Sequence, residues 1–156
     1  MGREIERKFL VASDGWRAAA DAGVAIEQGY LSSNAKATVR VRIVDGARAV
    51  LTLKGRAKGY VRAEYEYEIP LMDARELMAL ARPHVIEKRR HLVQHAGLVW
   101  EVDVFAGRHA GLVLAEVELV AEDQAVDLPD WVGREVSDDK RFYNASLSRA
   151  EGLPRA

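Results

Sequence analysis

Residues 3–11 read REIERKFLV, and within this stretch the charged residues Glu4, Glu6 and Lys8 alternate with Ile5, Arg7 and Phe9. Successive side chains of a β-strand point to opposite faces. One face of such a strand would carry Glu4, Glu6 and Lys8, whereas Ile5 and Phe9 would lie on the other. The stretch therefore predicts a strand with one charged face and one apolar face.

The same period-two alternation recurs along most of the chain. It appears in 25–32, 37–44, 48–55, 61–70, 85–95, 98–105 and 113–121. Short connections such as VDGA and HAG favour an antiparallel meander or barrel over parallel βαβ units. Capping signals and apolar spacing predict three helices, over 13–23, over 73–82 with Asp73 as the N-cap, and over 137–152 starting at Ser137. We find no repeat or linker and expect one domain over 1–156.

Composition excludes several classes of function. A net charge of −1 gives no reason to expect nucleic acid or an anionic membrane as partner. The chain has no cysteine, which excludes disulfides, thiolate metal sites and cysteine nucleophiles. No apolar run approaches the roughly 18–20 residues of a membrane span. We therefore expect a cytoplasmic protein with no nucleic-acid or membrane partner.

Like charges gather on one face of almost every predicted strand. An isolated pair of this kind is usually a solvated surface. Residues i and i+2 of a strand lie roughly 6.6 Å apart, and like charges at that distance repel by roughly 2–3 kcal/mol at an effective dielectric near 20. Acidic pairs favour hard cations and basic pairs favour a polyanion. The pairs are Glu4 and Glu6, Arg40 and Arg42, Glu64 and Glu66, Lys88 and Arg90, Glu101 and Asp103, and Glu116 and Glu118.

Closing the sheet with its charged face inward would allow the acidic pairs to bind cations and the basic pairs to bind a polyanion in one interior space. A barrel of about eight strands can hold a small ligand, and an interior this charged must contain water, metal and anion. The three helices are then the available covers for the apolar outer face. We predict an α+β fold built on a closed antiparallel barrel of about eight strands that forms a charged tunnel. An open two-layer α+β domain with a charged concave face is the alternative.

The motifs of other phosphate-binding and hydrolytic sites are absent. The chain contains no G-x-x-x-x-G-K-[ST] and no G-x-G-x-x-G, so it has neither a P-loop nor a Rossmann turn. It also lacks the G-x-S-x-G elbow and the H-E-x-x-H zinc motif. Any binding of phosphate would therefore not use these motifs.

In order, the segments EIERKFLV, VRVR, LTLKG, RAEYEYEIP, EKRR, EVDVFAG, AEVEL and DDKRFYN resemble the CYTH superfamily, also called the triphosphate tunnel metalloenzymes. The resemblance covers about residues 3–145. It implies an eight-stranded antiparallel barrel whose tunnel holds triphosphate and a divalent metal. Small bacterial members of the family look like inorganic triphosphatases, and related members are thiamine triphosphatases, class IV adenylate cyclases and RNA triphosphatases.

The resemblance also implies roles for individual residues. Triphosphate would be bound by Lys8, Arg40, Arg42, Lys54, Lys88 and Arg90. The metal, Mg²⁺ or Mn²⁺, would be bound by Glu4, Glu6, Glu64, Glu66, Glu116 and Glu118, with Asp103 as a further ligand; both cations prefer oxygen ligands. Glu4, Glu6, Lys8 and Lys54 are the predicted catalytic residues.

Two further expectations concern the lysines and the C-terminal segment. If Lys8 and Lys54 share one site, each ammonium should lower the pKa of the other. After DDKR, relatives more often read Tyr-Lys, whereas this chain has Phe142 and Tyr143. We take the C-terminal helix to be a lid, and we carry over no residue beyond Arg141.

The leading hypothesis is metal-dependent hydrolysis of inorganic triphosphate to diphosphate and phosphate by a monomer or homodimer. One alternative is a class IV-type adenylate cyclase or a thiamine triphosphatase, for which Tyr30 is the candidate to stack on a base. The other is a non-catalytic polyphosphate-binding module. The glutamates argue against that module, because carboxylates oppose anion binding unless metals intervene. The sequence leaves the physiological substrate and the choice of metal open.

Overall fold

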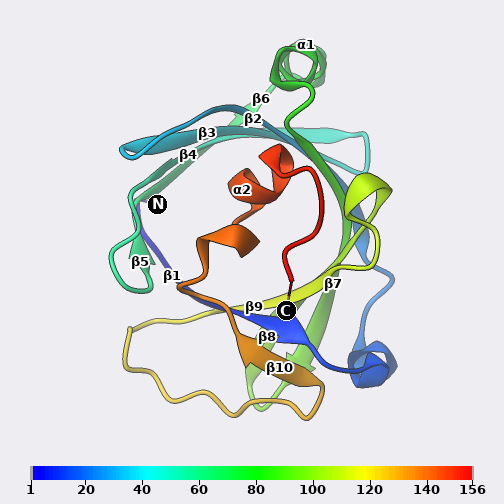
Figure 1. Cartoon of the computed structure of the whole chain (residues 1–156), viewed down its shortest axis with the longest axis vertical. Coiled ribbons are helices and arrows are strands. Elements are labelled where there is room, and N and C mark those ends of the chain that lie inside the picture. The colour runs from blue at the N-terminus through cyan, green and yellow to red at the C-terminus, as the bar shows by residue number, and fades with distance from the viewer. Residues whose placement is uncertain (1, 156) are drawn as a thin grey trace.

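The computed structural model describes residues 2–155, which form a nearly closed antiparallel barrel (Figure 1). The strand order is β10-β1-β9-β8-β7-β2-β3-β4-β6, and β5 pairs with β1. The strands are β1 Glu4–Val11, β2 Val24–Ser33, β3 Ala37–Val44, β4 Arg48–Gly55, β5 Val61–Arg62, β6 Glu64–Ile69, β7 Val85–His95, β8 Leu98–Phe105, β9 Val113–Glu118 and β10 Val132–Glu135. The predicted α+β barrel is confirmed.

The barrel closes between β6 and β1 through the short strand β5. The predicted strand 61–70 is divided at Ala63 into β5 and β6. β5 pairs with β1 at Glu4 and Arg62, and the Glu64 amide donates to the Gly2 carbonyl at 3.3 Å. The last strand of the sheet is thereby brought beside the first.

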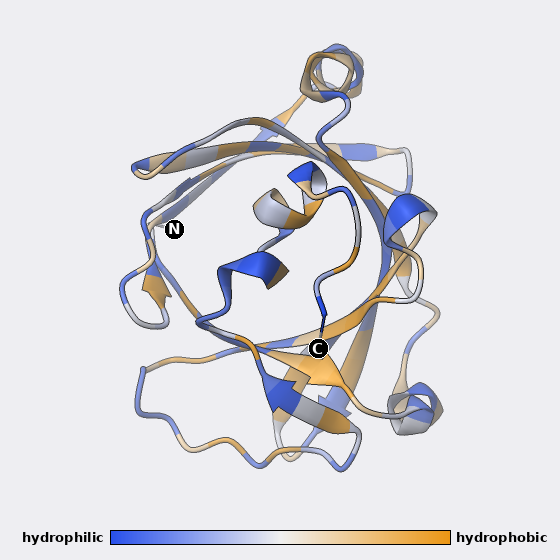
Figure 2. Ribbon diagram, in the orientation of Figure 1, coloured by the Kyte–Doolittle hydropathy of each residue, from blue (hydrophilic) through white to orange (hydrophobic). Residues whose placement is uncertain are grey.

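The two faces of the strands differ as the alternation predicts, and Figure 2 shows hydrophilic and hydrophobic residues in turn along the barrel strands. Outside β1, β8 and β9, buried side chains form an aromatic core centred on Trp100, which contacts Phe9 and Trp131. Trp16, from the 3₁₀ helix η1 (Asp14–Ala19), belongs to the same core. This side of the barrel is covered by η1 and the segment that carries Trp131, without an α-helix.

We expect Trp100→Ala to lower the free energy of unfolding by about 3–5 kcal/mol, as large-to-small changes at fully buried aromatics do. Trp100 has no exposed surface, whereas the neighbouring Val99 is 43% exposed. Urea unfolding of Val99→Ala, expected within about 0.5 kcal/mol of wild type, is the control. A loss below 1 kcal/mol for Trp100→Ala would contradict this view of the outer core.

The helix α1 (Leu71–Ala81) covers the outer face of β2, β3 and β4. Its approach depends on Gly29, where an added Cβ would lie 2.7 Å from the Cβ of Ala81. The predicted N-cap is wrong: Pro70 occupies the cap position, and Asp73 lies within the first turn. The predicted helix at 13–23 is the shorter η1, with Ser13 as its cap. No helix within residues 2–155 is long and apolar enough to cross a bilayer.

The single helix predicted from Ser137 is also wrong. The segment forms two short pieces, the 3₁₀ helix η3 (Lys140–Phe142), capped by Asp139, and α2 (Asn144–Arg149). Both pieces lie within the ring of strands seen in Figure 1. Phe142 and Leu147 are fully buried there, in a cluster formed with Tyr30, Ile86, Phe105, Leu112, Leu114 and Val136. The C-terminal segment therefore packs against apolar residues of the inner face and covers nothing outside the barrel.

Candidate functional site

A cavity of about 720 Å³ lies inside the barrel and is lined by charged side chains from almost every strand. All the predicted triphosphate-binding and metal-binding residues line it, with the exception of Asp103. The inward parity of the strands brings these residues together although they span positions 4 to 118. The cavity divides into an acidic half near β1, β6 and β9 and a basic half near β3 and β7.

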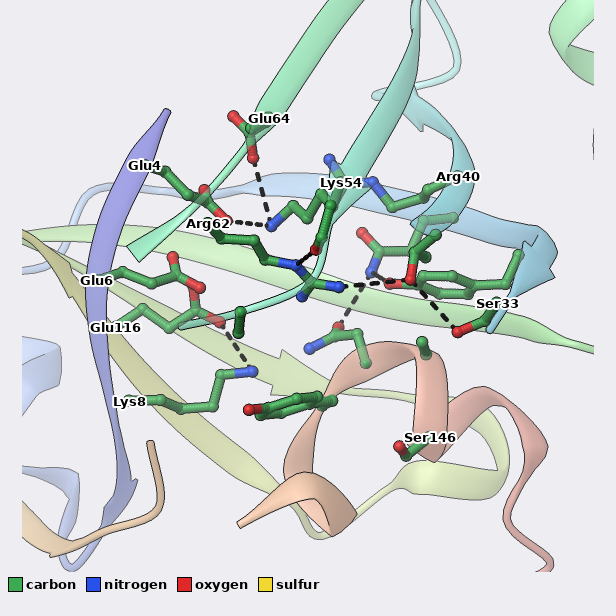
Figure 3. A pocket seen from close by; sticks show the side chains of 18 of the residues that line it. Glu4, Glu6, Lys8, Ser33, Arg40, Lys54, Arg62, Glu64, Glu116 and Ser146 are labelled. Carbon is green, nitrogen blue, oxygen red and sulfur yellow. Dashed lines mark hydrogen bonds and ion pairs between the residues drawn. The ribbon is translucent and has the colours of Figure 1, made fainter. Parts of the chain in front are cut away.

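In the acidic half, Lys54 holds two glutamates together (Figure 3). Its Nζ lies 2.7 Å from Oε1 of Glu4 and 3.3 Å from Oε2 of Glu64. Burial lowers the pKa of Lys54, but Glu6 and Glu4 outweigh it, so the pKa is raised. The prediction that Lys8 and Lys54 depress each other's pKa is therefore wrong for Lys54, because its ammonium lies among carboxylates.

Glu6 is the carboxylate with the least favourable surroundings. It lies opposite Glu118 in the register of β1 and β9, and within residues 2–155 no basic side chain forms an ion pair with it. Burial and the nearby Glu116 raise the pKa of Glu6 to about 8. Glu116 itself lies 3.4 Å from the Lys8 ammonium, and despite burial Lys8 and Arg90 hold its pKa well below the usual range.

These carboxylates fit a divalent metal that also binds substrate. Within the described residues, no three acidic or histidine side chains converge into a ready-made metal cage. Mg²⁺ is commonly bound through one or two carboxylates, with water and substrate phosphate completing its coordination. The facing pair Glu6 and Glu118 has the donor chemistry for this arrangement. The nearby Glu116 and Glu4 make an ionised Glu6 unfavourable until a cation neutralises it.

In the basic half, Arg40 and Arg42 form no ion pair with any carboxylate in residues 2–155. Arg40 donates from Nη2 to the Thr52 hydroxyl at 3.0 Å, and its buried Nε has no partner. Arg42 donates from Nε to Oε1 of Gln28 at 3.0 Å. Burial and the neighbouring Arg40 lower the pKa of Arg42 to about 9. Buried cations without counter-ions are costly unless an anion joins them.

Asp103 lies behind the cavity wall and holds two of the cations. Its oxygens accept from Nε and Nη2 of Arg90 at 2.8 and 2.9 Å, and Lys88 Nζ lies 2.7 Å away. Although burial opposes it, Arg90 and Lys88 hold the pKa of Asp103 well below its usual range. Glu101 contacts the remaining side of Arg90 at 2.9 Å. Both oxygens of Asp103 are thus engaged by cations.

The cavity also contains residues outside the predicted set, including Gln28, Tyr143 and Asn144. Arg62 is another: it donates to the Gly55 carbonyl at 2.6 Å and reaches Thr38 (Figure 3). Strand parity places Arg62 on the charged face with Glu64 and Glu66, and it could also have indicated Gln28. Nothing local in the sequence indicates that Asn144, beyond the last strand, returns to the tunnel.

The raised pKa of Glu6 predicts how the stability of the metal-free protein depends on pH. Its usual value is 4.5, so between about pH 5 and 7 the folded protein retains a proton that the unfolded chain has lost. The free energy of unfolding should then fall as pH rises through this window. Urea unfolding in EDTA at pH 5, 6 and 7 measures the slope. An equally steep slope in Glu6→Gln would show that Glu6 is not its source.

Comparison with known proteins gives a consistent result. The CYTH domain model matches residues 2–148. An inorganic triphosphatase of Acetivibrio thermocellus is 45% identical over 148 residues, covering 94% of each chain. An inorganic triphosphatase of Nitrosomonas europaea is 39% identical over 151 residues, covering 93% of this chain and 96% of the relative. The crystal structure of the inorganic triphosphatase NE1496 matches with a TM-score of 0.69 and 34% identity, covering 96% of both chains.

Proposed function

The chain belongs to the CYTH domain family, and from this membership we propose that it is a metal-dependent triphosphatase that hydrolyses inorganic triphosphate to diphosphate and phosphate inside the barrel. The observation that carries the proposal is the charge arrangement of the cavity. Within residues 2–155, the buried Arg40 and the half-buried Arg42 form no ion pair with a carboxylate, the half-buried Glu6 forms none with a cation, and all three line the same 720 Å³ space. A polyanion bound with a divalent cation satisfies both groups at once.

The basic half supplies the binding of the phosphates. Guanidinium groups make bidentate contacts with phosphate oxygens, and among the residues that the structure describes no carboxylate forms an ion pair with Arg40 or Arg42. Lys8, Lys54, Lys88 and Arg90 line the same cavity. We assign Asp103 to the positioning of Lys88 and Arg90 in place of the predicted metal ligation, because both its oxygens are engaged by these cations.

The acidic half supplies the ligands for Mg²⁺ or Mn²⁺. Glu6 and Glu118 would hold the metal, with Glu116 beside them, and Glu66 forms no ion pair within the described chain. A bound divalent ion would polarise phosphate oxygens and neutralise charge that develops during phosphoryl transfer. Lys54 keeps Glu4 and Glu64 oriented at the edge of this group. Glu4, Glu6, Lys8 and Lys54 remain the proposed catalytic residues.

The alternative functions have less support. A cyclase or thiamine triphosphatase needs a surface that recognises the organic part of its substrate, and Tyr30 was the candidate. Tyr30 is only 4% exposed, packs in the apolar inner cluster, and accepts a hydrogen bond from Gln28 through its hydroxyl. A binding module would have no need of Glu6, whose burial without a cation is unfavourable. Location in the cytoplasm, assembly as a monomer or homodimer and the lack of nucleic-acid or membrane partners stay predictions.

The test is phosphate release by the purified protein from inorganic triphosphate, ATP and thiamine triphosphate, each with Mg²⁺, Mn²⁺ or EDTA. We expect rapid hydrolysis of inorganic triphosphate that EDTA abolishes, with much slower turnover of the other two. Conversion of ATP to diphosphate without free phosphate would favour the cyclase. Tight binding without turnover of any substrate would favour the binding module.

A further inference from the structure

Two cations of the cavity are joined by a pair of side-chain amides. Gln28 Oε1 accepts from Arg42 Nε at 3.0 Å, and Gln28 Nε2 donates to Asn144 Oδ1 at 3.0 Å. The same Asn144 oxygen accepts from Lys88 Nζ at 2.8 Å. A continuous chain of hydrogen bonds thus runs from Arg42 through Gln28 and Asn144 to Lys88, and it links β3, β2, α2 and β7.

The side-chain amide of Gln28 uses its oxygen and both of its hydrogens in hydrogen bonds. Its side chain has no exposed surface, it lies directly opposite Arg42 in the register of β2 and β3, and its second amide hydrogen is donated to the Tyr30 hydroxyl at 2.8 Å. Buried polar groups that are fully hydrogen-bonded restrict their neighbours to one arrangement. Gln28 therefore orients Arg42 and Tyr30 together.

The two residues that bridge Arg42 and Lys88 are neutral amides and carry no negative charge. Asp103 and Glu101 already oppose part of the positive charge of Lys88 and Arg90. A carboxylate at position 28 or 144 could accept the same hydrogen bonds from Arg42 or Lys88, but it would remove more of the charge that an anionic substrate needs. An amide oxygen orients a cation and leaves its net charge intact.

We propose that Gln28 and Asn144 are positioning residues, forming a neutral bridge that holds Arg42 and Lys88 in register for the triphosphate without cancelling their charge. This inference rests on the proposed function. It also assigns a role to the C-terminal segment: Asn144 is the first residue of α2, which the buried Leu147 anchors within the barrel. The segment completes the basic half of the cavity.

Asn144→Asp is the decisive variant, because an aspartate oxygen can accept both hydrogen bonds while adding one negative charge. We expect its KM for inorganic triphosphate to rise about tenfold, its kcat to change less than about threefold, and its Tm to stay at or above that of wild type. Gln28→Met, which removes the bridge, should also raise KM about tenfold. A purely structural role predicts that Asn144→Asp keeps the wild-type KM, and that result would overturn the proposal.

Matched controls come from Gln94, an exposed residue near the end of β7 that does not line the cavity. Gln94→Glu and Gln94→Met repeat the added charge and the lost amide away from the cavity, and both should behave as wild type. Calorimetric binding of inorganic triphosphate in EDTA gives a readout independent of turnover.

If wild type binds triphosphate but hydrolyses none with either metal, the proposed function fails, and the affinities of the variants still decide on the bridge. If wild type hydrolyses triphosphate and Asn144→Asp and Gln28→Met have the same KM and affinity as wild type, only the proposal of the bridge fails. If wild type neither binds nor hydrolyses triphosphate, the proposed function and the proposal of the bridge both fail.

Discussion

Glu6→Gln is expected to lower kcat for metal-dependent hydrolysis of inorganic triphosphate by about 10³-fold while it stabilises the metal-free protein. The loss of activity follows because a bound divalent ion contributes several kcal/mol of charge stabilisation in the transition state, and an amide cannot supply the charge of the carboxylate ligand. The gain in stability follows because Glu6 is buried beside Glu116 with no ion-pairing cation in the described chain. Near pH 7 the folded protein keeps Glu6 protonated, because its pKa is about 8, whereas the unfolded chain would ionise it; glutamine is uncharged in both states and removes this cost.

This prediction is specific because kcat should fall while the stability of the metal-free protein should rise. Steady-state kinetics with saturating Mg²⁺ or Mn²⁺ and thermal unfolding in EDTA measure the two effects. Glu68→Gln is the control, since Glu68 lies near the end of β6, is mostly exposed, and within the described chain forms an ion pair with Arg48 alone, at 3.9 Å. A variant at Glu6 that loses activity and stability together would indicate a structural role, and one that retains activity would remove Glu6 from the metal site.

Arg40→Met should have the largest effect on substrate affinity. Hydrogen bonds to charged groups contribute about 1.5–3 kcal/mol, and each 1.4 kcal/mol is tenfold in affinity. Within residues 2–155, the buried Nε of Arg40 has no hydrogen-bond partner and no carboxylate forms an ion pair with this residue, so we expect KM to rise about 10- to 100-fold. Because an unpaired buried cation is removed, Tm should not fall.

Calorimetry with inorganic triphosphate in EDTA measures the effect of Arg40→Met directly. Arg75→Met provides the control, because Arg75 is an exposed residue of α1 on the outside of the barrel. An affinity within twofold of wild type would show that Arg40 does not contact the substrate. A large fall in Tm would instead mean that its bond to Thr52 is needed for packing.

Much of the fold could be predicted from the alternation of side chains alone. A strand's period of two is a local property, so REIERKFLV already determines that Glu4, Glu6 and Lys8 share one face. Burying the apolar faces of many such strands leaves few arrangements, and the barrel is one of them. Helix boundaries were less predictable: Asp73 has the residue type of an N-cap, but the chain enters α1 at Pro70. The short strand β10 has no clear pattern of its own and depends on pairing with β1.

The sequence by itself determined which side chains of each strand point to the inner face of the barrel, because strand parity is set by neighbours along the chain. Only the tertiary structure decided how those charges combine: Lys54 with Glu4 and Glu64, and Asp103 with Lys88 and Arg90. It also decided that the C-terminal segment enters the barrel, where Asn144 meets Gln28. These pairings depend on register between strands and on the packing of distant segments. Their energies come from burial and long-range contacts, which no local pattern of residues encodes.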